Sequence, residues 1–95
     1  MPERVVTIGS KVGLHARPAA LFVKAAGAQP VVVRIGKPGS DPVDARSILS
    51  VLALDARGGD EVVLFAEGDG AEAALDELAS LISRDLDSPD AEGGA

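Results

Sequence analysis

The segment best suited to chemistry is Gly13-Leu14-His15-Ala16-Arg17-Pro18-Ala19-Ala20, which contains the only histidine of this 95-residue chain. Imidazole has an unperturbed pKa near neutrality, so its ring is largely uncharged and nucleophilic at pH 7. Arg17 adds a permanent cation that can donate two hydrogen bonds to a phosphate. A neutral ring nitrogen beside an anion-binding cation is what phosphoryl transfer to a histidine requires.

Pro18 limits where a helix can begin in this segment. An alanine-rich, apolar run continues to Gly27, and proline is tolerated only in the first turn of a helix. The helix must therefore begin close to His15, and the backbone N–H groups of Ala16 and Arg17 are expected to face a phosphate on its ring. Taken singly, a histidine before a helix is most often a cap and an arginine a solvated charge. The complete octapeptide favours the phosphate site.

The rest of the chain alternates short β-branched segments with helical ones. Residues 4–8, 31–35 and 61–66 are predicted strands, with a further short strand around Val43. Apolar residues at helical spacing predict a last helix from Ala71 to Ile82, and Ser47 is the predicted N-cap of a short apolar helix. The order is strand, helix, two strands, helix, strand, helix. Three helices on one face of a four-stranded sheet would bury these apolar faces, in an α+β fold.

Length and composition narrow the class of protein. We expect one domain over residues 1–86 and an acidic, disordered tail over 87–95. The net charge of −6 argues against nucleic acid binding. With no cysteine and one histidine, a metal site is not expected, and nothing points to a cofactor. No apolar run is long enough to span a membrane and no secretory pattern opens the chain, which predicts a cytoplasmic protein without membrane insertion.

The octapeptide resembles the active-site signature of the HPr family, the histidine-containing phosphocarriers of the bacterial phosphoenolpyruvate:sugar phosphotransferase system. A second region, residues 46–55, is similar to the family's regulatory-serine segment, and the similarity extends over roughly residues 3–86. The resemblance implies an open-faced β-sandwich, an antiparallel sheet covered on one side by helices. It implies that phospho-enzyme I phosphorylates His15 at Nδ1, that Arg17 assists, and that enzyme II A domains then receive the phosphoryl group for sugar uptake. Such a chain is a carrier with a phosphohistidine intermediate, not a stand-alone catalyst.

The short helix after Ser47 is the predicted docking element. It has too many apolar residues for one narrow buried stripe, so some must face outward. The resemblance implies that Ile48, Leu49 and Leu52 bind the partner proteins.

The first helix is expected to extend this docking surface with Ala20 and the rim cation Lys24. Arg46 is a second candidate rim cation. For Phe22 and Val23, burial in the core and exposure on the docking surface are equally open. The resemblance and these features are compatible with a monomer.

Two alternatives remain open. In some family members the serine matching Ser47 is phosphorylated by a kinase, which slows histidine phosphorylation and recruits a transcriptional regulator. The chain is then a regulatory binding protein, with a Ser kinase/phosphorylase among its partners. The other alternative is a paralogue in a nitrogen- or dihydroxyacetone-linked relay. The segment from Gly36 to Pro42 is longer and richer in proline than the family's usual turn, which should alter the hairpin tip.

Overall fold

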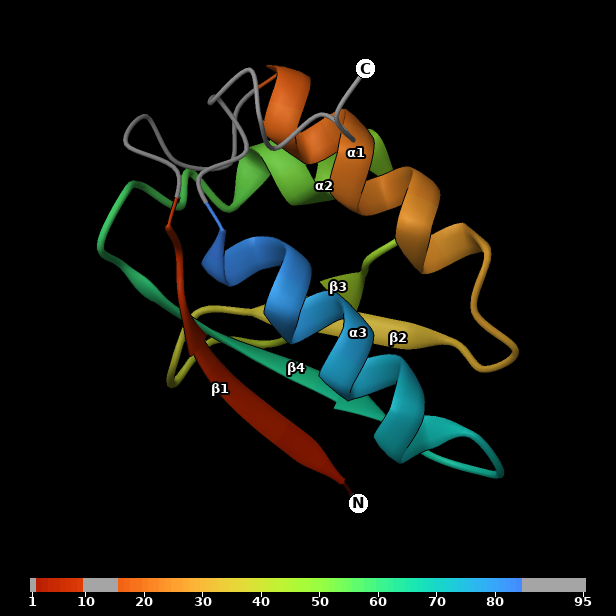
Figure 1. Ribbon diagram of the computed structural model, residues 1–95. Coiled ribbons are helices and arrows are strands. Elements are labelled where there is room, and N and C mark those ends of the chain that lie inside the picture. The colour runs from red at the N-terminus through yellow and green to blue at the C-terminus, as the bar shows by residue number, and fades with distance from the viewer. Residues whose placement is uncertain (1, 10–15, 85–95) are drawn as a thin grey trace.

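The computed structural model describes residues 2–9 and 16–84, which form a four-stranded sheet and three helices (Figure 1). The predicted order of elements and the α+β fold class are confirmed. The elements are β1 (Glu3–Thr7), α1 (Ala16–Gly27), β2 (Val33–Gly36), β3 (Val43–Asp44), α2 (Ile48–Ala53), β4 (Glu61–Ala66) and α3 (Ala71–Ser83).

The sheet is antiparallel throughout, with the strands in the order β1-β4-β2-β3. Successive side chains of a strand point to opposite faces, and one face carries the buried apolar positions. On this face Val6, Ile35 and Leu64 join one core cluster with Phe22 of α1 and Leu78 of α3. The three helices cover this face and leave the opposite face open (Figure 1). The sheet is therefore an open-faced sandwich, as the resemblance implied.

Strand boundaries differ from the prediction where a strand has no neighbour to pair with. We predicted a strand from Val31, but β2 begins at Val33, which pairs with Ala66, the last residue of β4. Beyond Ala66 the chain turns into α3, so Val31 and Val32 have no ladder partner. In the same way β1 ends at Thr7, opposite Glu61, the first residue of β4. Pairing across the sheet fixes both limits.

The end of β1 packs tightly against the end of α3. The backbone N–H of Gly9 donates a hydrogen bond to the carbonyl of Ile82, with a nitrogen–oxygen distance of 3.0 Å. A Cβ atom at position 9 would collide with the carbonyl group of Ser83, so only glycine fits without displacing backbone. This contact anchors the chain immediately before the segment that leads to His15.

Candidate phosphohistidine site and docking surface

The helix that follows His15 begins where the proline predicted. His15 itself lies outside the described residues, and Ala16 is the first residue of α1. Pro18 is fully buried in the first turn, whereas the Arg17 side chain between them is exposed. The opening turn of a helix has backbone N–H groups that the helix itself does not use, which makes it suited to bind an anion. The opening turn of α1 therefore holds an exposed guanidinium two residues from the histidine.

One face of α1 is exposed and one is buried. Arg17, Ala20 and Lys24 are all exposed, and their spacing of three and four residues places them on the same side of the helix. The sequence leaves open whether Phe22 is buried in the core or exposed on the docking surface, and the structure buries it completely in the core. Val23 is half-buried and packs against the core cluster. The exposed side of α1 thus combines two cations and a small residue.

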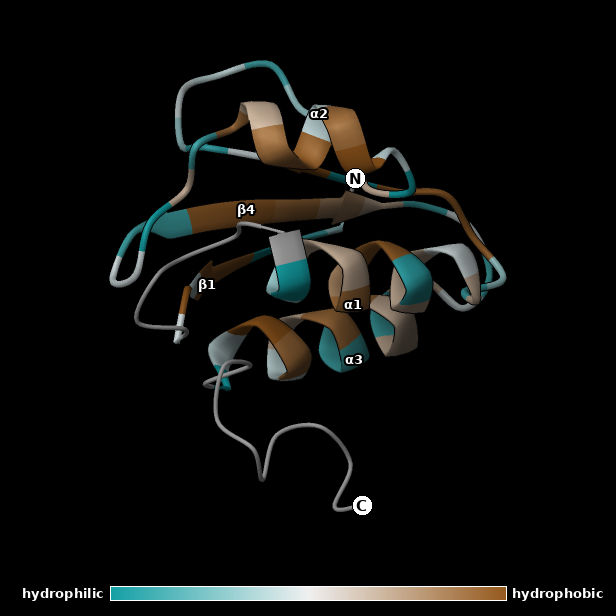
Figure 2. Cartoon of the chain, turned by 90° about the horizontal axis from the view of Figure 1, so that it is seen from above, coloured by the Kyte–Doolittle hydropathy of each residue, from teal (hydrophilic) through white to brown (hydrophobic). Residues whose placement is uncertain are grey.

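The short helix α2 has more apolar surface than it buries. Val51 is fully buried in the core, and Leu54, which follows the helix, is partly buried against it. Ile48, Leu49 and Leu52 are 37%, 77% and 36% exposed, so the inference that some apolar residues face outward is confirmed. Figure 2 shows α2 as a largely hydrophobic helix, whereas hydrophilic residues recur along α1 and α3.

Ser47 caps α2 as predicted. Its backbone is extended, with φ −96° and ψ 111°, and its hydroxyl oxygen accepts a hydrogen bond of 3.3 Å from the backbone N–H of Ser50. The side chain is half-buried. The cap satisfies one of the N–H groups that open the helix, and so fixes the direction in which α2 leaves the loop.

Arg46, a candidate rim cation, is bound by a carboxylate that the sequence did not single out. Its Nε and Nη2 atoms donate to the two Asp44 oxygens at 3.1 and 2.9 Å, and its backbone N–H donates to Asp44 at 2.8 Å. The Arg46 side chain, followed by its backbone N–H, lowers the pKa of Asp44 to about 2. The same carboxylate raises the pKa of Arg46. The two-residue spacing of the acid and the base was the signal available in the sequence.

The fold brings the exposed sides of two helices together. Helices α1 and α2 pack against each other (Figure 1). We call the set contributed by both helices the α1–α2 surface. It consists of Arg17, Ala20, Lys24, Ile48, Leu49 and Leu52. It joins an apolar patch to Arg17 in the first turn of α1 and Lys24 in the last turn, which suits contact with a protein that has an acidic rim.

Neither a metal cluster nor a membrane span is found in the described part of the chain. Residues 2–9 and 16–84 contain no group of three or more histidine, cysteine, aspartate or glutamate side chains placed to hold a metal ion. None of the helices in these ranges has the length and apolar character that crossing a membrane requires.

Comparison with known proteins identifies the family. Residues 2–84 match the sequence model of the family described as "PTS HPr component phosphorylation site". The chain belongs to the HPr family. It is 52% identical over 87 residues to "Phosphocarrier protein HPr" of Streptomyces coelicolor, an alignment that covers 92% of this chain and 94% of that protein. The Pseudomonas aeruginosa protein of the same name is 42% identical, with 92% and 97% covered.

Solved HPr structures have the same fold. A phosphocarrier protein HPr from Bacillus anthracis superposes with a TM-score of 0.80 at 37% identity, covering 85% of this chain and 95% of that one. More distant relatives include "HPr-like protein Crh" of Bacillus subtilis, at 37% identity over 90% of this chain and all of that protein. The predicted function class of phosphotransferase-system phosphocarrier is confirmed at the level of the HPr family.

Proposed function

We propose that His15 is the residue that carries the phosphoryl group, accepting it from phospho-enzyme I and donating it to enzyme II A domains. The observation that carries this proposal is that α1 begins at the residue after His15 and exposes Arg17 from its buried first turn. The enzyme I and enzyme II partners follow from membership in the family. We propose further that it is a cytoplasmic carrier that acts as a monomer.

The transfer is a displacement at phosphorus. The lone pair of the neutral His15 Nδ1 forms a nitrogen–phosphorus bond while the bond from phosphorus to the donor group breaks, and the pair of electrons leaves with the donor. The reverse displacement passes the group to the acceptor domain. Negative charge develops on the three phosphoryl oxygens in both directions. We expect Arg17 and the N–H groups of Ala16 and Arg17 to stabilise that charge electrostatically.

The α1–α2 surface is the proposed docking site for both partners. Leu49, at 77% exposure, is the most exposed apolar side chain on it, and Ile48 and Leu52 flank it on the same helix. Lys24 and Arg17 add positive charge on the neighbouring helix. An acidic partner whose apolar residues cover α2 would bring its reacting group beside the start of α1.

The test is a phosphotransfer assay with phosphoenolpyruvate, magnesium and a cognate enzyme I. The expected product is one phosphate per chain that is labile in acid, stable in base and located on His15 by mass spectrometry. His15→Ala should abolish it with an unchanged far-UV spectrum, and Arg17→Ala should slow it without abolishing it. A phosphate that forms equally well in His15→Ala, or none in the wild type, contradicts the proposal. Comparing several enzyme I and acceptor proteins tells sugar, nitrogen and dihydroxyacetone relays apart.

A regulatory role for Ser47 is the second candidate, because this serine caps the helix that holds Ile48, Leu49 and Leu52. A phosphate there would add negative charge to the α1–α2 surface and repel an acidic partner. A Ser kinase/phosphorylase would add and remove it, and a transcriptional regulator would bind the modified form. Ser47→Asp should slow phosphoryl transfer, whereas Ser40→Asp on the exposed β2–β3 connection should not. Equal transfer rates in the two variants would contradict the regulatory role.

A further inference from the structure

The face of the sheet that no helix covers is built from a continuous set of side chains. By the strand register, Glu3, Phe65, Arg34 and Asp44 form one row across all four strands. Val5 and Val63 pair in the next row. None of these residues belongs to the core cluster, whose sheet residues point to the other face.

This open face exposes apolar side chains among its charged ones. Antiparallel sheets with one solvated face normally place polar residues there. Here Val5 is 54% exposed, and Val32, just before β2, is 47% exposed. They are two of the five large apolar residues that are exposed in the described ranges, and the other three lie on α2. Contiguous exposed apolar surface of this kind marks interaction sites.

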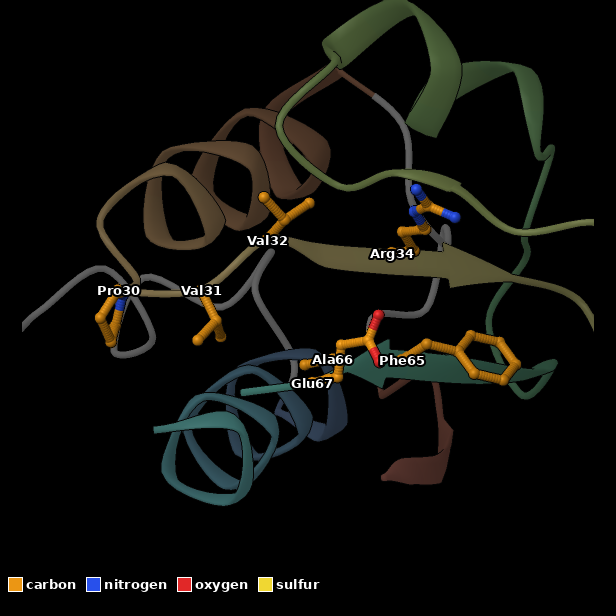
Figure 3. Close-up of a pocket in the computed structure, with 7 residues that line it drawn as sticks. All are labelled: Pro30, Val31, Val32, Arg34, Phe65, Ala66 and Glu67. Carbon is orange, nitrogen blue, oxygen red and sulfur yellow. The ribbon is translucent and has the colours of Figure 1, made fainter. Parts of the chain in front are cut away.

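A pocket opens at the end of this face, where β2 begins and β4 ends (Figure 3). Its volume is about 420 Å³, and the residues that line it include Pro30, Val32, Phe65 and the charged residues Arg34 and Glu67. Figure 3 shows the Glu67 carboxylate turned toward β2, whereas the Arg34 side chain extends from β2 on the side away from β4. The pocket is of a size to accept an apolar side chain, with one charge of each sign at its rim.

The charge around the apolar residues is mainly negative. Glu3, Glu61 and Glu67 are exposed and form no ion pair with any described residue, and the first two alternate with Val5 and Val63 on this face. Arg34 is the one cation in the rows across the strands, since Arg4 of β1 points to the helix side and pairs with Asp76 and Glu72 of α3. The face therefore has the opposite sign from the α1–α2 surface.

We propose that the open face is a second docking surface, for a protein segment that presents an apolar anchor flanked by lysine or arginine. The anchor fills the pocket between Val32 and Phe65, and the flanking cations meet Glu67 and Glu3, which lies opposite Phe65 in the strand register. Charge complementarity selects this occupant over an acidic one, which is the kind of partner that the α1–α2 surface suits. Because the α1–α2 surface belongs to the helices on one side of the sheet and the open face is the other side of the sheet, both partners can be bound at once.

The experiment is nuclear magnetic resonance mapping of the full ¹⁵N-labelled chain with synthetic seven-residue peptides. One set has a central phenylalanine or leucine with lysine and arginine flanks, a second has the same centre with glutamate flanks, and a third has cationic flanks around serine. The first set should give saturable shifts at β2 and β4, including Val32 and Phe65. We expect it to bind about tenfold more tightly than either matched set, since both the anchor and the charge contribute.

Variants locate the binding. Val32→Ser and Glu67→Lys should each weaken the first set by about tenfold, whereas Leu49→Ser on the α1–α2 surface should leave it unchanged. Both sheet-face variants should still accept phosphate on His15 at the wild-type rate, so this proposal can fail while the phosphocarrier function stands. Shifts confined to α1 and α2, equal binding of anionic and cationic sets, or no saturable binding would each overturn the proposal. Chemical-shift changes at β2 and β4 that appear on raising the protein concentration without peptide would overturn the proposal, because they would show that the open face binds a second copy of this chain.

Discussion

The α1–α2 surface and the open sheet face show two ways of leaving apolar side chains in water. On α2 the apolar residues are a surplus, because a six-residue helix with four large apolar side chains can bury only one of them fully. On the sheet they are the far side of strands whose near side forms the core. The first surface is rimmed by cations and the second by carboxylates. Similar apolar content with opposite charge suits different partners, and the sheet keeps the two partners apart.

The largest expected effect is on stability, and it compares a phenylalanine in the core beneath the helices with one on the open face. Phe22 is completely buried, whereas Phe65 on the open face is only partly buried. Phe22→Ala should destabilise the protein by about 3–5 kcal/mol through lost burial and a cavity. Phe65→Ala should cost about 1–2 kcal/mol, from partial burial and cross-strand contacts. Urea unfolding measures both. Equal losses would mean that the open face is part of the core, and the comparison would fail.

A matched pair of charge substitutions tests which surface serves phosphoryl transfer. Leu49→Asp should lower kcat/KM for transfer from enzyme I by about thirtyfold, or ~2 kcal/mol, as expected for an exposed anchor at the centre of an interface. Val5→Asp introduces the same charge on the open face, at an exposed position of the edge strand β1, and should leave this rate unchanged. Both variants keep the core intact, because both side chains are more than half exposed. A similar loss of kcat/KM in Val5→Asp would mean that enzyme I docks on the open face of the sheet and not on the α1–α2 surface.

The parts of the structure that depend on neighbouring residues in the chain could be predicted from the sequence. Pro18 and Gly27 delimit α1, and Ser47 caps α2, because these effects act within one turn. The start of β2 could not be predicted, since it depends on where β4 ends, some thirty residues away. The burial of Phe22 was open for the same kind of reason. Helical spacing shows which residues share a face, but only packing decides which face is covered.

Some features of the candidate site could likewise be predicted from the sequence, and others could not. The histidine, its arginine and the exposed leucines follow from a contiguous motif and from a surplus of apolar residues. The binding of Arg46 by Asp44 needs the loop geometry between β3 and α2. An open sheet face was predicted, but which residues of β4 lie on it was not, because β4 is apolar on both of its faces and the sequence does not show which of them the helices cover.

The cap of α2 gives the next smaller effect. Ser47→Ala removes the acceptor for the Ser50 N–H and should destabilise the protein by about 1 kcal/mol. Because the cap orients the helix that carries Ile48, Leu49 and Leu52, the same variant should also weaken docking at the α1–α2 surface. Peptide binding at the open face should not change. Thermal unfolding and the two binding assays measure these effects, and a loss of binding on both surfaces would show that they are not independent.

The smallest expected effect concerns Asp44, which lies between the two surfaces. It lies opposite Arg34 in the register of β2 and β3 and forms an ion pair with Arg46 beside α2. Its pKa in the folded protein, about 2, lies below its ordinary value of 3.8. The ionised carboxylate therefore stabilises the folded state above about pH 4, and this contribution is lost as the pH falls toward 2. Since the pair is substantially exposed, Asp44→Asn should cost less than about 1 kcal/mol at pH 7.

Unfolding at pH 7 and at pH 2, with and without Asp44→Asn, measures this contribution. The difference in unfolding free energy between wild type and variant should shrink at the lower pH, and Asp41→Asn on the β2–β3 connection is the matched control. In Arg46→Gln, a carbon-detected titration should find the pKa of Asp44 raised toward its ordinary value. A difference that persists at pH 2 would mean that Asp44 acts through its shape and not its charge. If the difference disappears, Arg46 is held by Asp44, and the positive charge of the α1–α2 surface rests on Arg17 and Lys24.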